Sequence, residues 1–330
     1  MHNTLDRSPE PVYLVGQGQI TLEIEKLVND IKATFKPIAL SRSGFTESAY
    51  FDGMFFIRLK NSLNRYFTQF SPHYQYSPHL NVFWQACRDI GLWPEGQGLM
   101  TRGLYQVTMD HIIGLVRKIA EYSRSKQFDE AVKRRHYQVR ENQRSLRNFA
   151  SHIHDHYARV LLIRVDLSYK PEFYGFITID DVLEHRSSFF RRKEYHPVFN
   201  HLVAHAWAVE QGNDTGGFHI HAAFYFRGDR RQYDWAIGKD IGELWEQVTG
   251  HGRYFNCNTP KHKEYFRQRN KLGIGMIHRD RPLEVQNGIN TTTYLTDPTK
   301  QDQHLRVQPI QSRVFGSGCI AALRKDNRHV

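Results

Sequence analysis

The chain has 330 residues, enough for two domains that each bury a hydrophobic core. Its 45 Lys and Arg exceed its 34 Asp and Glu and give a net charge of +11. This positive charge favours a polyanionic partner such as a nucleic acid. The three cysteines, Cys87, Cys257 and Cys319, are widely spaced without a Cys-x-x-Cys pair, which argues against a disulfide framework and a zinc knuckle. Residues 1–7 hold no apolar signal region and no run of about 18 apolar residues occurs, so we expect a cytoplasmic protein without a membrane span.

Residues 1–158 are predicted to form a mostly α-helical N-terminal region. Apolar residues recur every three or four positions over 20–31 and 104–119, as they do in amphipathic helices, and neither segment holds a chemical motif. A longer helical stretch over 132–158 is studded with Lys and Arg, which indicates either a DNA-contacting face or a solvated basic helix. The candidate DNA-binding residues on it are Arg140, Arg144 and Arg147.

This stretch ends in a histidine cluster formed by His152, His154 and His156. In a helix, residues two positions apart are separated by about 200° and do not share a face. We therefore interpret the cluster as exposed histidines at a helix end and not as a metal site.

From residue 160 the pattern changes to strands that alternate with helices, and it predicts an α+β domain over 159–330 in which helices pack on an antiparallel sheet. Residues 160–168 should form a buried strand, and residues 179–190 a helix with acidic residues in its first turn. The other elements expected here are a helix over 235–248 and short strands over 253–257 and 274–278.

Two strand-like runs, 201–210 and 218–226, flank a link rich in Gly, Asn and Asp, and they predict a β-hairpin. Alternate residues of a strand project from one face, so His219 and His221 should lie side by side. Glu210 ends the first strand, where the pairing of the two strands can bring its carboxylate near both imidazoles.

Two imidazoles and one carboxylate suit a divalent cation that acts as a Lewis acid on a phosphate, with Mg²⁺ or Mn²⁺ favoured over structural zinc. We expect the ligands to be His219, His221 and Glu210, with Asp166 as the next candidate for the third position. The alternative is that the two histidines are merely packed or surface residues of a strand.

The last chemical motif lies in residues 290–303. Tyr294 offers a phenol nucleophile, and Lys300 offers a cation that steadies a phosphate or phenolate, which together are what a DNA strand-transfer enzyme needs. Because the chain has 17 tyrosines, a packing or surface role is the alternative for any one of them. The nearest competitor as nucleophile is Tyr265, in the charged run 261–267.

Taken in order, these segments resemble the HUH endonucleases, the superfamily of rolling-circle replication initiators, relaxases and related transposases. The resemblance covers about residues 158–318 and is closest to the inovirus (filamentous phage) gene-2-like family, also called YagK/YfjJ. The chain departs from that family at one point: the family runs Tyr-Leu-Thr-Lys, whereas here residues 297–299 intervene before Lys300. The segments that carry the likeness are 161–166, Glu210 with 218–221, 253–258, 273–277, 294–296 with Lys300, 305–306 and 313–316.

The resemblance implies a Rep-like nuclease fold and a metal-dependent transesterification on single-stranded DNA. In such a reaction His219, His221 and Glu210 hold Mg²⁺ or Mn²⁺, and Tyr294 attacks the scissile phosphate to leave a 5′-phosphotyrosine and a free 3′-OH that primes rolling-circle replication. The implied partners are a single-stranded replication origin and the host replication helicase and polymerase, with no membrane.

Other functions fit parts of the same pattern. A relaxase or a single-strand transposase would use the same residues on a different DNA substrate. A DNA-binding repressor or replication accessory protein would keep the fold without catalysis. A His-triad nucleotide hydrolase is rejected, because it needs another histidine where this chain has Ala223.

Overall fold

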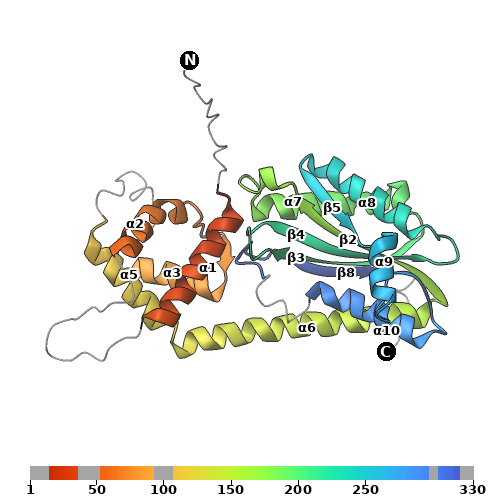
Figure 1. Ribbon diagram of the computed structural model, residues 1–330, viewed down its shortest axis with the longest axis horizontal. Helices are drawn as coiled ribbons and strands as arrows, with labels where there is room; N and C mark the ends of the chain where they lie inside the picture. Colours follow the sequence, from red (N-terminus) through yellow and green to blue (C-terminus); the bar gives the residue numbers. More distant parts are fainter. Residues whose placement is uncertain (1–14, 36–52, 93–106, 297–303, 320–330) are drawn as a thin grey trace, which may run out of the picture.

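The computed structural model describes residues 15–35, 53–92, 107–296 and 304–319, and the fold is given for these ranges. A helical region forms one end of the molecule and a sheet flanked by helices forms the other, with one long helix running beneath both (Figure 1). Among the described residues, no helix combines the length and the hydropathy that a membrane span requires.

The helical region packs around its own hydrophobic core, which includes Leu63, Phe83 and Ile112. Its sequence sets the helix starts: the Ser77 hydroxyl accepts a hydrogen bond from the Leu80 N–H, and Thr108 forms a capping box with His111. The helices are α1 (Gln17–Thr34), α2 (Gly53–Phe67), α3 (Pro78–Asp89) and α5 (Met109–Tyr122). The helix predicted over 20–31 is confirmed. The one predicted over 104–119 is confirmed from Met109 onward, after its N-cap Thr108, and residues 104–106 lie outside the described residues.

Helix α6 (Lys126–His156) connects the two ends of the molecule. At a rise of about 1.5 Å per residue, its 31 residues span roughly 46 Å. Phe128 near its start packs in the core of the helical region, whereas Leu146 and Ile153 near its end pack against the sheet. The sheet therefore draws part of its core from residues that precede the predicted boundary at 158.

The main sheet has six strands among the described residues, in the order β5-β2-β4-β3-β8, and β6 also pairs with β2. Every pairing is antiparallel, which confirms the predicted α+β class and the strands expected from the sequence. The strands are β2 (Arg159–Tyr169), β3 (Leu202–Gln211), β4 (Phe218–Arg227), β5 (Gly252–Asn256), β6 (Gly275–His278) and β8 (Phe315–Cys319). Strand β8, and a separate pair of β1 (Tyr74–Tyr76) with β7 (Val307–Pro309), were not expected from the sequence.

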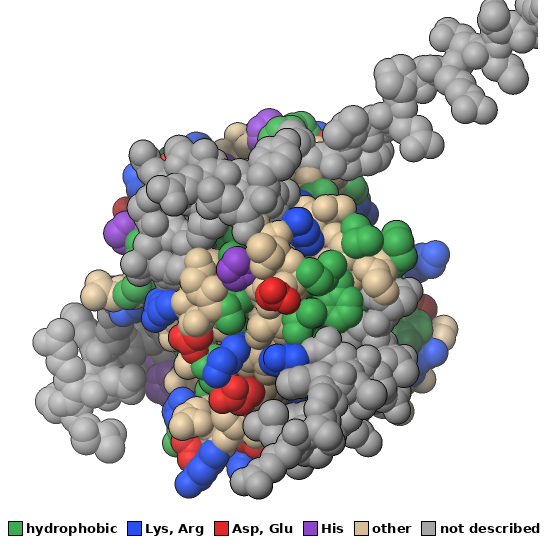
Figure 2. Space-filling model, turned by 90° about the vertical axis from the view of Figure 1, so that its left-hand side faces the viewer, with side chains coloured by type: hydrophobic (Ala, Val, Ile, Leu, Met, Phe, Trp, Pro, Cys, Tyr) green, Lys and Arg blue, Asp and Glu red, His purple; other side chains and the backbone are tan. Residues whose placement is uncertain are grey.

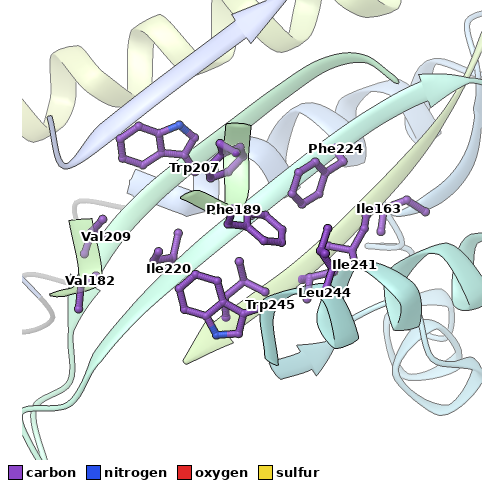
Figure 3. Packing of buried hydrophobic residues seen from close by; sticks show 14 of the residues in the cluster. Ile163, Val182, Phe189, Trp207, Val209, Ile220, Phe224, Ile241, Leu244 and Trp245 are labelled. Atoms are coloured by element: carbon purple, nitrogen blue, oxygen red, sulfur yellow. The ribbon is translucent and has the colours of Figure 1, made fainter. Parts of the chain in front are cut away.

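Helices cover both faces of the sheet, so its central strands are apolar on both sides. One face packs Ile163, Ile220 and Phe224 against α7 (Ile179–Arg191) and α8 (Asp234–Thr249) (Figure 3). The opposite face packs against α6, α10 (Pro282–Thr293) and the 3-10 turn Tyr294–Thr296. Because side chains alternate along a strand, even positions of β2 and odd positions of β4 belong to this second face, which we call the α6 face.

A buried ionic cluster joins the helical region to the sheet. Glu25 of α1 pairs with the guanidinium of Arg306, and its Oε1 lies 2.9 Å from His304 Nε2 and 3.3 Å from His79 Nδ1. Burial alone would raise the pKa of Glu25, but His304 and Arg306 lower that pKa to about 2. The Arg306 backbone N–H also donates to Gln211, the last residue of β3, at 3.0 Å. The cluster thus anchors the strand end that carries Glu210.

The outer end of the helical region shows Lys, Arg, Asp and Glu side chains intermingled around a group of hydrophobic side chains (Figure 2). The exposed large hydrophobic residues that the structure describes in this region include Met54 and Ile57 of α2 and Met109 at the start of α5. This mixture of charges does not single out the outer end as a surface for a polyanion.

The expectation of exposed histidines at the end of α6 is wrong for His154. The helix packs on the sheet, so His154 is only 2% exposed, with its ring 5.9 Å from that of Tyr225. His156 is exposed, as expected. Burial lowers the pKa of His154 to about 4, so this histidine is uncharged in the folded protein at neutral pH.

We expect the free energy of unfolding to fall as the pH is lowered from about 6.5 to about 4, because the unfolded chain then binds a proton at His154 that the folded protein excludes. His154→Leu should reduce that dependence by on the order of 1.4 kcal/mol per pH unit within this window. Urea denaturation at several pH values measures it, and His156→Gln is the matched control. Identical pH dependence in the wild type and His154→Leu would contradict the prediction.

Candidate metal centre

Three neighbouring strands carry polar side chains on the α6 face at the same level of the sheet. In the pairing of β3 with β4, Glu210 lies opposite His219, and Ala208 lies opposite His221. In the pairing of β2 with β4, Asp166 lies opposite His221. The register alone therefore gathers two imidazoles and two carboxylates from residues far apart in the sequence.

The three predicted metal ligands converge in the structure. Glu210 Oε2 lies 2.9 Å from His221 Nε2 and 3.5 Å from His219 Nε2. One potential ligand atom from each of the three side chains falls within 4.8 Å of the other two, and no other group of His, Cys, Asp or Glu within the described ranges meets this criterion. Glu210 and His221 are buried, while His219 is partly exposed and leaves an approach from solvent.

The donor atoms fit a divalent cation. Both imidazole Nε2 atoms face the same carboxylate oxygen, so their lone pairs can point to one shared position. Two nitrogens and one oxygen leave coordination positions for water or phosphate oxygens, and this donor set can take Mg²⁺, Mn²⁺ or Fe²⁺.

Asp166 holds His221 in place and is not one of the three converging ligands. The Nδ1–H of His221 donates to Asp166 Oδ1 at 2.6 Å, which directs Nε2 toward Glu210. Burial alone would raise the pKa of Asp166, but His221 and Arg164 hold that pKa well below its usual range. Burial alone would lower the pKa of His221, yet Asp166 and Glu210 raise it. Asp166 is therefore ionised in the folded protein and lies behind the candidate metal ligand His221.

Arg164 links this carboxylate to Tyr294. The guanidinium of Arg164 lies 3.3 Å from Asp166 Oδ1, and its central carbon lies 4.9 Å from the centroid of the Tyr294 ring. Tyr294 begins the 3-10 turn that follows α10. Leu295 is fully buried and anchors this turn, whereas Tyr294 remains 43% exposed. A chain of direct contacts thus runs from the candidate nucleophile to a candidate metal ligand.

The three predicted DNA-binding arginines take no part in the contacts described for this site. Arg140, Arg144 and Arg147 are exposed on α6, and Arg144 pairs with Glu141 at 3.2 Å. Lys300 lies outside the described residues.

The place of Arg164 in the site was not expected from the sequence. A signal was present, because residues 160–167 are apolar except for Arg164 and Asp166, and a buried strand retains charged residues only where they are paired. Their spacing of two also places them on one face.

No family model, curated protein or solved structure matches the chain.

Two carboxylate substitutions should weaken metal binding for different reasons. Glu210→Gln removes a charged ligand and Asp166→Asn weakens the support of His221, so each should lower the affinity for Mn²⁺, the latter by about 10- to 100-fold. Isothermal titration with Mn²⁺ measures the effect. Asp229→Asn is the control, because Asp229 is a surface carboxylate that pairs with Arg227 at the far end of β4. Wild-type affinity in Glu210→Gln would place the third ligand elsewhere.

Proposed function

We propose that the protein cleaves single-stranded DNA by metal-dependent transesterification with Tyr294 as the nucleophile. The observation that carries the proposal is the chain of contacts from the donor set through Asp166 and Arg164 to the Tyr294 ring. A donor set of this kind serves many reactions, but a half-exposed phenol linked to it through Arg164 and Asp166 favours attack on a phosphodiester. The order of the segments, which resembles that of the HUH endonucleases, supports a replication initiator of a phage, prophage or plasmid.

The proposed reaction needs no reactant other than the protein, the DNA and a divalent ion. A divalent ion held by Glu210, His219 and His221 would polarise the scissile phosphate. The Tyr294 oxygen attacks the phosphorus, the new phenol O–P bond replaces the bond from phosphorus to the 3′ oxygen, and the proton lost by the phenol is matched by one gained at the 3′ oxygen. The products are a 5′-phosphotyrosine and a 3′-OH, which can rejoin by the reverse reaction because the phosphodiester energy is retained.

Arg164 would assist as a fixed positive charge. Burial would lower the pKa of Arg164, but Asp166 raises it above its ordinary value, so the guanidinium is charged at any pH at which the protein is folded. Its position over the Tyr294 ring favours the negative charge that develops on the phenol oxygen and on the phosphate. Lys300 remains a second candidate for this role on the resemblance alone.

The central experiment is a cleavage assay with single-stranded oligonucleotides that tile the DNA flanking the gene, in the presence of Mn²⁺. The wild type should form a covalent adduct whose DNA-linked peptide contains Tyr294, and Tyr294→Phe should bind the same DNA but form no adduct, because only the attacking hydroxyl is lost. Tyr233→Phe, at a tyrosine that is 80% exposed, is the control.

His219→Ala, His221→Ala or a chelator should also abolish the adduct. A DNA-linked peptide containing Tyr265, or an adduct that survives in Tyr294→Phe, would defeat the assignment.

Loss of the charge at Arg164 should slow the same reaction. In single-turnover cleavage, Arg164→Gln should form the adduct at least about tenfold more slowly, and Arg164→Lys should recover part of the rate because it keeps the charge but not the planar contact. Arg186→Gln is the matched control, because Arg186 lies over the Trp207 ring at 4.4 Å but belongs to α7, on the opposite face of the sheet. A wild-type rate in Arg164→Gln would remove Arg164 from the site.

A further inference from the structure

Strand β5 and helix α9 (Pro260–Arg267) carry four aromatic rings in continuous contact. The ring centroids of Phe255 and His262 are 5.4 Å apart, those of His262 and Phe266 are 4.9 Å apart, and those of Phe266 and Tyr265 are 5.1 Å apart. We call these four residues the aromatic row. Phe255 is 52% exposed and Tyr265 is 50% exposed, although rings that serve only packing are usually buried.

The aromatic row begins beside the candidate metal centre. Phe255 lies opposite Asp166 in the pairing of β5 with β2, and Asp166 lies opposite His221 in the pairing of β2 with β4. Side chains at paired positions share a face, so Phe255 projects from the α6 face two strand spacings from His221, which is about 10 Å. From there the row leads away from the centre onto α9.

Positive charges accompany the aromatic row. The guanidinium of Arg269 lies over the Tyr265 ring, 3.7 Å from its centroid. Arg253, Lys261 and Lys271 are exposed, and Arg253 precedes Phe255 by two positions on the same strand face. The ion pairs that the structure shows on α9 do not use these residues; they join Lys263 to Asp234 and Arg267 to Glu264.

We propose that the aromatic row is a stacking platform for unpaired bases of the single-stranded DNA that leads to the metal centre. Exposed rings interleaved with Lys and Arg are the combination that binds single strands, because every base has a face to stack and every nucleotide a phosphate to neutralise. A duplex keeps its bases stacked on one another and cannot use the rings. The inference rests on the proposed function for the route of the strand, and it gives Tyr265 a role in binding and not in nucleophilic attack.

The test measures binding in chelator, where no cleavage occurs, by fluorescence anisotropy of a labelled oligothymidylate. Phe255→Ala and Tyr265→Ala should each weaken binding by about 5- to 150-fold, the value expected for loss of one stacked base. Phe255→Tyr and Tyr265→Phe, which keep a ring, should restore the affinity. Tyr195→Ala is the control at an aromatic side chain that is 66% exposed and follows α7 on the opposite face.

A ligand control separates stacking from charge. An abasic oligomer of the same length should bind the wild type and the two alanine variants equally, because it offers phosphates but no bases. The alanine variants should also keep the wild-type slope of log affinity against log salt, whereas Lys261→Gln and Lys271→Gln should each reduce that slope by about 0.7.

The outcomes separate the aromatic row from the proposed function. Three results would each overturn the platform. The first is wild-type affinity for oligothymidylate in both alanine variants, and the second is a loss of affinity in these variants that is equally large for the abasic oligomer. The third is a wild-type protein that binds duplex DNA as tightly as single-stranded DNA. If the platform holds but no Tyr294 adduct forms, the platform stands and the proposed cleavage falls. If the adduct forms while loss of the rings has no effect on binding, the cleavage stands and the platform falls.

Discussion

The candidate site depends on one constraint, the antiparallel register of β2, β4 and β3. A slip of one residue in β4 would turn His219 and His221 to the opposite face and bring Ile220 into the site in their place. Such a slip is costly because both faces are buried: Ile220 and Phe224 fill the core against α7 and α8, and Tyr225 fills the core against α6 and α10. Hydrophobic packing on both faces of the sheet therefore fixes the geometry at which the donors meet.

The charges of the site are interdependent because they are buried. Asp166 stands between His221 and Arg164: it accepts the Nδ1–H of His221 and pairs with the guanidinium of Arg164, a buried charge that would be costly in the sheet without it. The arrangement ties the orientation of the candidate metal ligand His221 to the guanidinium over the Tyr294 ring. The position of Arg164 over the Tyr294 ring and the orientation of the candidate ligand His221 thus both depend on a single carboxylate.

The helical region supports the site at the end of β3 that carries Glu210. The Glu25 cluster fixes Arg306, and Arg306 holds Gln211, the residue that follows Glu210. Helix α6 packs in both hydrophobic cores, so α6 and this cluster together connect the helical region to the sheet. Residues 1–158 carry no recognisable chemical motif, but the packing of their described part helps to determine where the carboxylate of Glu210 lies.

The sequence by itself determined what depends on local periodicity: the strands 160–168, 201–210 and 218–226, the turn between the last two, and therefore the shared face of His219, His221 and Glu210. Only the tertiary structure decided what depends on contacts between distant segments. It made Asp166 the partner of His221 instead of a ligand, brought Arg164 over a tyrosine 130 positions away, and buried His154 beneath the sheet. The reason is physical: periodicity reports which face a residue occupies, whereas the partner across that face is chosen by strand pairing and helix packing over long separations.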